Sequence, residues 1–269
     1  MARPMRRLLS FDCDGAALGA TLDAAEGDIG LLLVTGGSQT RIGSHRMYER
    51  LAYALQENKI SCLRFDRRGV GDSEGEDPGY RASGPDLAAA AATLRRERPD
   101  IRRLYGFGLC DGATAIALFP TEAGLDGLIL VNPWLVETAA DEPPAAAIRA
   151  HYRQQLLSLE GWRKLLFGAI SYRKLLRGIG KLFSRQDEAL AAAVAGAMVR
   201  HRVPTQLILA TGDATAIAAE AELRAARFRG LIGHTQKLET DSHTFARPGD
   251  EATLHAAVLA AIRSLAQAS

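Results

Sequence analysis

The sequence has no long apolar segment, few cysteines and no strong excess of charge of either sign. No uninterrupted apolar run reaches the ~18 residues of a membrane-spanning helix, and residues 1–10 have no apolar signal-peptide core. The 33 Lys and Arg nearly balance the 31 Asp and Glu, which argues against a dedicated nucleic-acid-binding protein. Cys13, Cys62 and Cys110 are odd in number and lack the spacing of a metal site. We therefore expect a soluble cytoplasmic protein with no disulfide framework, no metal ion and no cofactor.

The rest of the chain has the composition of a globular domain. Its 269 residues are 47% hydrophobic and 24% charged, enough to build a sizeable core without cross-links. Short apolar runs alternate with longer amphipathic stretches, an order typical of a mostly parallel sheet with helices on both faces. The predicted strands cover residues 7–11, 16–22, 30–35, 60–65, 103–107, 125–131, 205–210 and 235–238. The predicted helices cover residues 47–57, 86–98, 113–119, 216–228 and 251–266.

Residues 133–203 interrupt this alternation, because they contain helical patterns and no convincing strand. About 70 residues is too long for a single crossover helix. We interpret the segment as a helical lid, and residues 1–132 and 204–269 as the α/β core. Between residues 145 and 203 there are 11 Arg and Lys against 3 Asp and Glu, a surplus of 8 positive charges. Aromatic, basic and aliphatic residues recur together at 162–167 and 172–177, which suits either the solvated faces of lid helices or contact with an anionic membrane or carrier.

The candidate nucleophile is Cys110. The predicted strand at 103–107 leads into Gly-Leu-Cys-Asp-Gly at 108–112 and then into a helix, which is the context of a nucleophile elbow with Cys in place of Ser. Gly108 and Gly112 would let neighbouring backbone approach a strained turn. The helix N-terminus would favour a thiolate over a thiol. The alternative is a buried structural cysteine.

A cysteine nucleophile requires an imidazole and a carboxylate that orients it. His243 follows the last predicted strand, in a loop that can return over Cys110; His45 is its rival near the strand ends. Asp213 directly follows a buried strand, where catalytic groups gather in open α/β sheets. It could instead only cap the next helix, and Asp241 is the alternative acid.

Two glycine-containing loops follow the first core strands. Gly36 and Gly37 end the first of these strands, and the backbone N–H of Gly37 could form an oxyanion hole with that of Asp111. The loop at 65–73 leaves the next strand, and we interpret it as a structural turn in which Asp66 and Arg68 join loops. It lacks the phosphate-binding P-loop pattern.

These motifs make the chain resemble the α/β-hydrolases over its whole length. The Asp-x-Arg-Gly-x-Gly-x-Ser type loop at 65–73 and the elbow at 108–112 carry this resemblance. Three segments resemble, more narrowly, the exosortase A system-associated hydrolases of the hydrolase 1 type. They are GGSQTRIGSHR at 36–46, LRFDRRGVGDSEG at 63–75 and YGFGLCDGA at 105–113. Those proteins accompany exopolysaccharide and protein-sorting gene sets in Gram-negative bacteria.

The resemblance implies Cys110 as nucleophile, Asp213 as acid and His243 as base, a triad similar to that of dienelactone hydrolase. It also implies that residues 133–203 form the lid. Four residues of the narrower motif, Gly36, Arg41, His45 and Arg46, would bind an anionic or oxygen-rich substrate group; the alternative for their side chains is an ion-paired loop.

We therefore expect a hydrolase that cleaves an ester or thioester of a small-molecule or carrier-bound acyl substrate through a covalent acyl-enzyme. Within the same chemistry, the acceptor could be a glycan or lipid hydroxyl instead of water. The alternative from a different class is a non-catalytic protein that docks on a membrane-associated polysaccharide machine through the basic lid. Cys in place of Ser keeps that alternative open, because a thiolate suits activated acyl donors better than ordinary esters.

Overall fold

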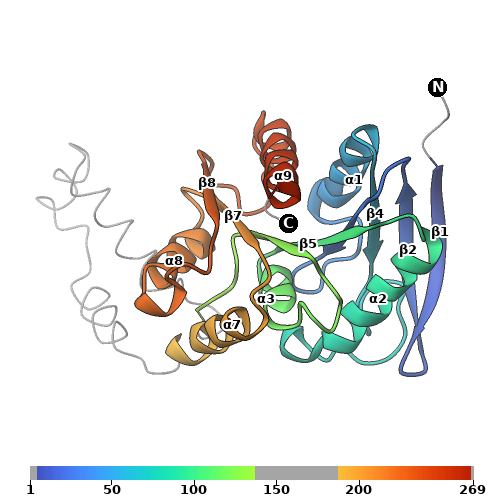
Figure 1. Cartoon of the computed structure of the whole chain (residues 1–269), viewed down its shortest axis with the longest axis horizontal. Helices are drawn as coiled ribbons and strands as arrows, with labels where there is room; N and C mark the ends of the chain where they lie inside the picture. The colour runs from blue at the N-terminus through green and yellow to red at the C-terminus, as the bar shows by residue number, and fades with distance from the viewer. Residues whose placement is uncertain (1–4, 137–186, 268–269) are drawn as a thin grey trace, which may run out of the picture.

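The computed structural model describes residues 5–136 and 187–267 and contains one 8-stranded sheet between layers of helices (Figure 1). The strand order is β1-β2-β4-β3-β5-β6-β7-β8. The β1–β2 and β2–β4 pairs are antiparallel, and every later pair is parallel. The prediction of a mostly parallel sheet with helices on both faces is therefore confirmed.

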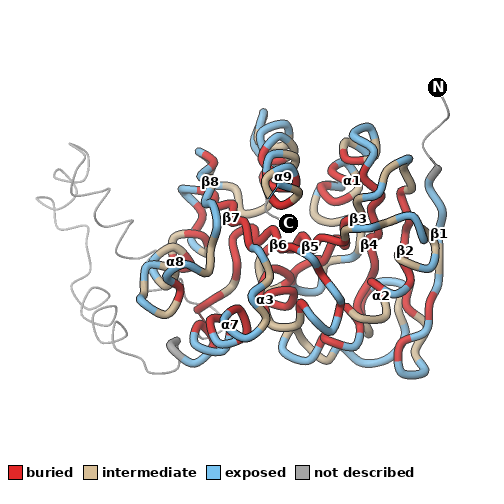
Figure 2. The backbone as a smooth tube through the Cα atoms, viewed as in Figure 1, coloured by how far each residue is buried: buried red, intermediate tan, exposed pale blue. Residues whose placement is uncertain are grey.

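The five central strands are apolar because helices cover both faces of the sheet there. They are β4 (Ile60–Phe65), β3 (Ile29–Val34), β5 (Arg103–Leu109), β6 (Gly127–Val131) and β7 (Thr205–Ala210), and nearly all of their residues are buried. Figure 2 shows the same concentration of buried backbone along the middle of the sheet. The edge strand β8 (His234–Leu238) is mostly exposed, and its sequence is correspondingly polar.

The amino-terminal hairpin extends the other edge of the sheet. It consists of β1 (Met5–Cys13) and β2 (Ala16–Ala24), joined at Asp14 and Gly15. Both turn residues have positive φ, 51° and 83°, as a two-residue hairpin turn requires. An Asp-Gly pair between two strands is typical of such a turn.

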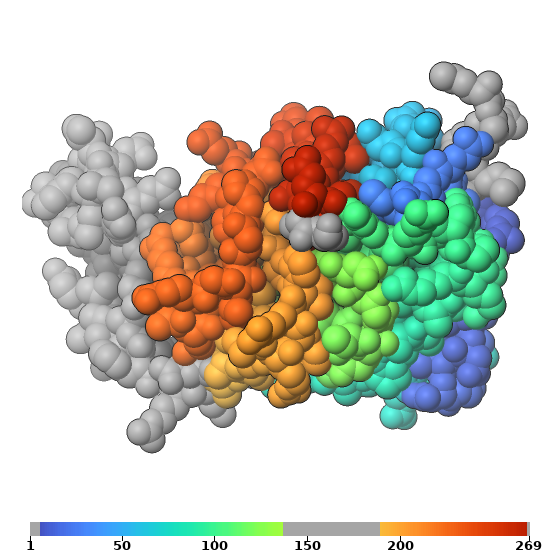
Figure 3. Space-filling model, viewed as in Figure 1, coloured from blue at the N-terminus to red at the C-terminus, as the bar shows by residue number. Residues whose placement is uncertain are grey.

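The helices lie in two layers (Figure 1). Helices α1 (Met47–Glu57) and α9 (Asp250–Gln267) cover one face and contact each other, as the space-filling view in Figure 3 also shows. Helices α2 (Gly84–Glu97), α3 (Asp111–Leu118) and α7 (Asp187–His201) lie on the other face, and α8 (Ala214–Leu223) packs on β7. Three 3-10 turns complete the described elements: η1 (Ser44–Arg46), η2 (Tyr80–Ala82) and η4 (Ala226–Phe228).

Only the two ends of the predicted lid, residues 133–136 and 187–203, fall within the described residues. Helix α7 packs against α3, and its apolar residues Leu190, Val194 and Met198 belong to the common core. The basic aromatic segments at 162–167 and 172–177 lie outside the described residues. Among the helices at 5–136 and 187–267, none combines the length and the apolar character needed to cross a membrane.

Candidate active site

Cys110 stands in a strained turn between β5 and α3. Its φ of 59° and ψ of −127° are unusual for a residue with a side chain, and it is only partly buried. A Cβ on Gly108 would lie 2.5 Å from the backbone of Gly112 and Ala113, and one on Gly112 would lie 2.5 Å from the carbonyl oxygen of Val34. The two glycines therefore let β5, α3 and β3 approach closely enough to form the elbow.

His243 and Asp213 come from two loops at the carboxyl ends of neighbouring strands. Asp213 follows β7, and the His243 loop follows β8. The imidazole Nδ1–H donates to Oδ2 of Asp213 at 3.0 Å, and the side chain of Cys110 lies near enough to help raise the pKa of the same imidazole. The three predicted catalytic side chains are thus brought together in the order nucleophile, base, acid.

Asp213 has a second role as the N-cap of α8. Its Oδ2 accepts the backbone N–H of Ala216 at 2.9 Å, and its side chain is 8% exposed. From the sequence, Asp213 could either cap the next helix or orient His243. In the structure its carboxylate does both. Asp241, the other candidate acid, instead forms a bidentate exposed ion pair with Arg247, with both distances at 2.9 Å.

The environment of His243 favours the imidazolium form. Burial alone would lower the pKa of the imidazole, but hydrogen bonds to Asp213 and Cys110 and the negative charges of both groups outweigh it. Together they raise the pKa of His243 to about 10. A positively charged imidazole between a carboxylate and a sulfur is the arrangement that stabilises a thiolate.

The backbone around His243 is held by two side chains from distant segments. Asn132, at the end of β6, is fully buried; its Nδ2 donates to the carbonyl of His243 at 3.3 Å and its Oδ1 accepts the N–H of Ala210 at 2.9 Å. His45 Nε2 lies 2.8 Å from the carbonyl oxygen of Thr244. Our sequence reasoning missed Asn132, although an asparagine directly after a buried strand is a signal that could have been considered.

The predicted oxyanion loop lies beside the elbow. A Cβ on Gly36 would lie 3.0 Å from the Cβ of Cys110, so the loop passes close to the nucleophile. The N–H of Gly37 points at the side chain of Asp111 and donates to its Oδ1 at 2.6 Å. The backbone N–H of Asp111 has no acceptor in the part of the chain that the structure describes.

The two arginines proposed from the 36–46 motif are bound to the protein's own acids. Arg41 forms ion pairs with Asp66 and Asp72, and its side chain is 14% exposed. Arg46 pairs with Glu49, three residues further along. The ion-paired alternative therefore describes both arginines, whereas His45 contacts the loop that carries His243.

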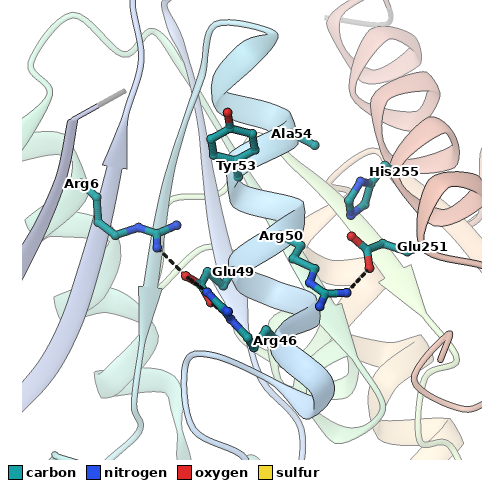
Figure 4. A pocket seen from close by; sticks show the side chains of 8 residues that line it. All are labelled: Arg6, Arg46, Glu49, Arg50, Tyr53, Ala54, Glu251 and His255. Carbon is teal, nitrogen blue, oxygen red and sulfur yellow. Dashed lines mark hydrogen bonds and ion pairs between the residues drawn. The ribbon is translucent and has the colours of Figure 1, made fainter. Parts of the chain in front are cut away.

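Arg46 lines a surface groove whose lining does not include Cys110. Figure 4 shows this groove between α1, α9 and the edge strand β1. Its volume is about 450 Å³, and its walls carry Arg6, Arg46, Glu49, Arg50, Tyr53, Ala54, Glu251 and His255. Its arginines are paired with Glu49 or Glu251, so their charge is compensated within the protein.

Within residues 5–136 and 187–267, no cluster of three His, Cys, Asp or Glu side chains is arranged to hold a metal ion.

Comparisons with known proteins agree with this fold. Residues 39–238 match the family described as serine aminopeptidase, S33. The esterase Pf2001 of Pyrococcus furiosus is similar in structure, with 15% identity, 97% of this chain and 92% of the other covered, and a TM-score of 0.65. XC6422 of Xanthomonas campestris, a serine hydrolase without a lid, has 18% identity, 98% and 96% coverage, and a TM-score of 0.61. A dienelactone hydrolase of Anabaena variabilis has 15% identity, 97% and 96% coverage, and a TM-score of 0.58.

No curated protein matched the chain significantly. The family match nevertheless spans far more than half of the 269 residues and includes Cys110 and Asp213. The chain therefore belongs to the serine aminopeptidase S33 family and has the α/β-hydrolase fold.

Proposed function

We propose that the protein is a hydrolase that cleaves an ester or thioester through Cys110, His243 and Asp213. The observation that carries this proposal is the imidazole of His243, which donates to Asp213 and whose pKa is raised by the side chains of both Asp213 and Cys110. A cysteine with a purely structural role does not require a neighbouring imidazole that is oriented by a carboxylate. The family's name refers to serine, so Cys110 gives this chain a different nucleophile on the family's fold.

The reaction begins with attack of the Cys110 thiolate on the carbonyl carbon of the acyl donor. A sulfur–carbon bond forms, and the carbonyl π electrons move to the oxygen, which becomes an oxyanion. Backbone N–H groups of Gly37 and Asp111 are the donors nearest to that oxygen. Collapse of the intermediate expels the leaving alcohol or thiol, which takes its proton from the His243 imidazolium.

The second half-reaction uses the change in charge that acylation causes. In the acyl-enzyme the sulfur is neutral, so one of the groups that raise the pKa of His243 is lost. The neutral imidazole can then take a proton from water, which attacks the thioester carbonyl. The Cys110 thiolate leaves, and the ion pair with His243 is restored.

The proposed acyl donor is an activated one, a thioester. Thiolates leave and attack readily at thioesters, and exchange between two sulfur atoms costs little free energy. A thioester on a small molecule or on an acidic carrier protein therefore suits Cys110, and the basic segment at 145–203 would attract such a carrier. Contact of this segment with an anionic membrane surface is part of the same proposal.

The motifs at 36–46, 63–75 and 105–113 support a role in exosortase and exopolysaccharide systems. The proposed location is the cytoplasm, where thiols stay reduced.

The proposal is tested by intact-mass spectrometry after incubation with p-nitrophenyl esters and acyl-CoA thioesters. The native protein should gain the mass of one acyl group, and Cys110→Ala should gain none although Cys13 and Cys62 remain. His243→Ala should form the adduct far more slowly. An adduct in Cys110→Ala, or equal turnover by this variant, would overturn the mechanism.

A further inference from the structure

The oxyanion hole proposed above contains a carboxylate of the protein itself. Oδ1 of Asp111 accepts the N–H of Gly37 at 2.6 Å, a bond between residues 74 positions apart in the chain. The contact depends on a close approach, because a Cβ on Gly36 would lie 2.7 Å from the same oxygen. The same Cβ on Gly36 would lie 3.0 Å from the Cβ of Cys110, so the Asp111 carboxylate and the Cys110 side chain both lie next to Gly36.

The two donors of the hole therefore differ. The Gly37 N–H has an anionic acceptor, while the Asp111 N–H has none in the described part of the chain. An ionised acceptor forms a stronger hydrogen bond than a neutral carbonyl oxygen does. A substrate carbonyl can use the Gly37 donor only after the Asp111 carboxylate has moved away.

A buried cation lies on the opposite side of the same residue. Arg67 is 2% exposed, and its Nη2 donates to the carbonyl oxygen of Gly37. Its Nε and Nη1 are buried without a partner among residues 5–136 and 187–267. A carboxylate that leaves the Gly37 N–H thus remains close to a positive charge.

We propose that Asp111 competes with the substrate's carbonyl oxygen for the Gly37 donor, and so limits how strongly the enzyme stabilises oxyanions. The inference rests on the proposed function, since it assumes that an acyl carbonyl is attacked by Cys110. Asp111 then has two opposite effects on the proposed reaction. Its backbone N–H is one donor of the oxyanion hole, whereas its carboxylate occupies the other donor, the N–H of Gly37.

The probe is a simple aldehyde such as butanal, which reacts reversibly with a cysteine nucleophile. The sulfur adds to the carbonyl carbon, the carbonyl π electrons move to the oxygen, and the proton of the thiol–imidazole pair ends on that oxygen. The resulting thiohemiacetal places an oxygen in the oxyanion hole. Alkylation by iodoacetamide consumes the same sulfur but forms no oxyanion, so it reports on the thiolate alone.

Two substitutions separate the negative charge of Asp111 from its hydrogen bond with the Gly37 N–H. Asp111→Asn removes the charge but keeps an oxygen that can accept the Gly37 N–H. Asp111→Ala removes the charge and leaves the donor open. We expect the aldehyde dissociation constant, normalised by the alkylation rate, to fall by roughly tenfold or more in Asp111→Ala and by less in Asp111→Asn.

Three outcomes are decisive. Tighter aldehyde binding in the order Ala, Asn, Asp supports the inference. Equal or weaker binding in Asp111→Ala, with normal alkylation of Cys110 and an unchanged circular dichroism spectrum, overturns it and leaves the proposed function intact. Failure of Cys110 in the native protein to react with iodoacetamide contradicts the proposed function itself.

Discussion

His243 keeps its positive charge over a wider pH range than an ordinary histidine. Burial would lower its pKa, but its bonds to Asp213 and Cys110 raise it to about 10. The imidazolium form therefore predominates at neutral pH and places a positive charge near the Cys110 sulfur. The residue's position depends on Asn132 and His45, which bind the backbone of its loop.

Replacing Asp213 with Asn should separate its two roles. An asparagine oxygen can still cap α8 at Ala216, so the free energy of unfolding should change by less than about 1 kcal/mol. The amide cannot stabilise the imidazolium of His243, so kcat/KM on a p-nitrophenyl ester should fall by about 10³-fold or more. Urea denaturation and steady-state kinetics measure the two effects.

Asp241→Asn is the matched control, because Asp241 lies two residues from His243 but pairs with Arg247. Its kcat/KM should stay within about twofold of the native value, since exposed ion pairs contribute little. A loss of activity in Asp241→Asn comparable to that in Asp213→Asn would show that the acid has been wrongly assigned.

At the scale of secondary-structure elements, the elbow depends on the missing side chains at Gly108 and Gly112. These glycines let the start of α3 approach β5 and β3 more closely than any Cβ permits. Loops at the carboxyl ends of β7 and β8 then carry Asp213 and His243 to the same place. The order of the strands in the sheet is therefore as important as the residue types for bringing Cys110, Asp213 and His243 together.

Gly112→Ala should therefore disturb the elbow. Its Cβ would meet the carbonyl oxygens of Val34 and Thr35 at 2.5 and 2.7 Å, and neither backbone group can move freely. We expect unfolding to become easier by about 1–3 kcal/mol and activity to be lost. Gly196→Ala in α7 is the control: nothing lies within 4 Å of its Cβ, and alanine favours a helix by up to ~1 kcal/mol. Equal stability of the two variants in thermal unfolding would contradict this explanation of the elbow.

The sequence predicted the bounds of an element well where the hydrophobic pattern of the element's own residues defines it. Strands β4 and β7 and helix α1 have the predicted bounds, because buried parallel strands are short apolar runs and amphipathic helices repeat every 3.6 residues. The predicted helix over 216–228 instead ends at Leu223 and is followed by the separate turn η4. The nucleophile, acid and base could be proposed because each follows a strand that was recognisable.

Contacts between distant loops could not be predicted in this way. The bond between Asp111 and Gly37 joins two loops, and nothing near Asp111 in the sequence indicates which way its carboxylate turns. Asn132 has a φ of 42°, which several residue types tolerate in a turn. The residues around Asn132 in the sequence therefore do not indicate its hydrogen bond to the carbonyl oxygen of His243. The pairing of Arg46 with Glu49, by contrast, follows from their i,i+3 spacing and could have been foreseen.

At the scale of the whole molecule, the antiparallel hairpin is joined to the parallel sheet through a buried ion pair. Asp23 of β2 is fully buried and accepts from Arg64 of β4 at 2.9 Å and from Arg6 of β1 at 2.6 Å. Arg64 is itself 2% exposed and also donates to the carbonyl of Arg41. These bonds cross the three strands at this edge of the sheet, far from the catalytic loops in sequence.

Asp23→Ala should destabilise the protein by about 3–5 kcal/mol, because it leaves the Arg64 guanidinium buried without its carboxylate. The double variant Asp23→Leu with Arg64→Met removes both charges and should recover a large part of this loss. Urea denaturation of both variants measures the effect, and kcat per folded molecule should not change. A single variant as stable as the native protein would show that the pair does not hold the hairpin to the sheet.

The most direct test of the central claim is the rate of Cys110 alkylation at neutral pH, measured by peptide mass spectrometry with iodoacetamide. Because the positively charged imidazole of His243 lies near the sulfur, we predict that Cys110 reacts much faster than the other two cysteines. Cys13, whose pKa is raised by burial and by Asp86 to about 11, and the buried Cys62 should react far more slowly. In His243→Ala most of the advantage of Cys110 over Cys13 and Cys62 should be lost. A native Cys110 rate no faster than that of Cys13, or a Cys110 rate unchanged in His243→Ala, would contradict the account.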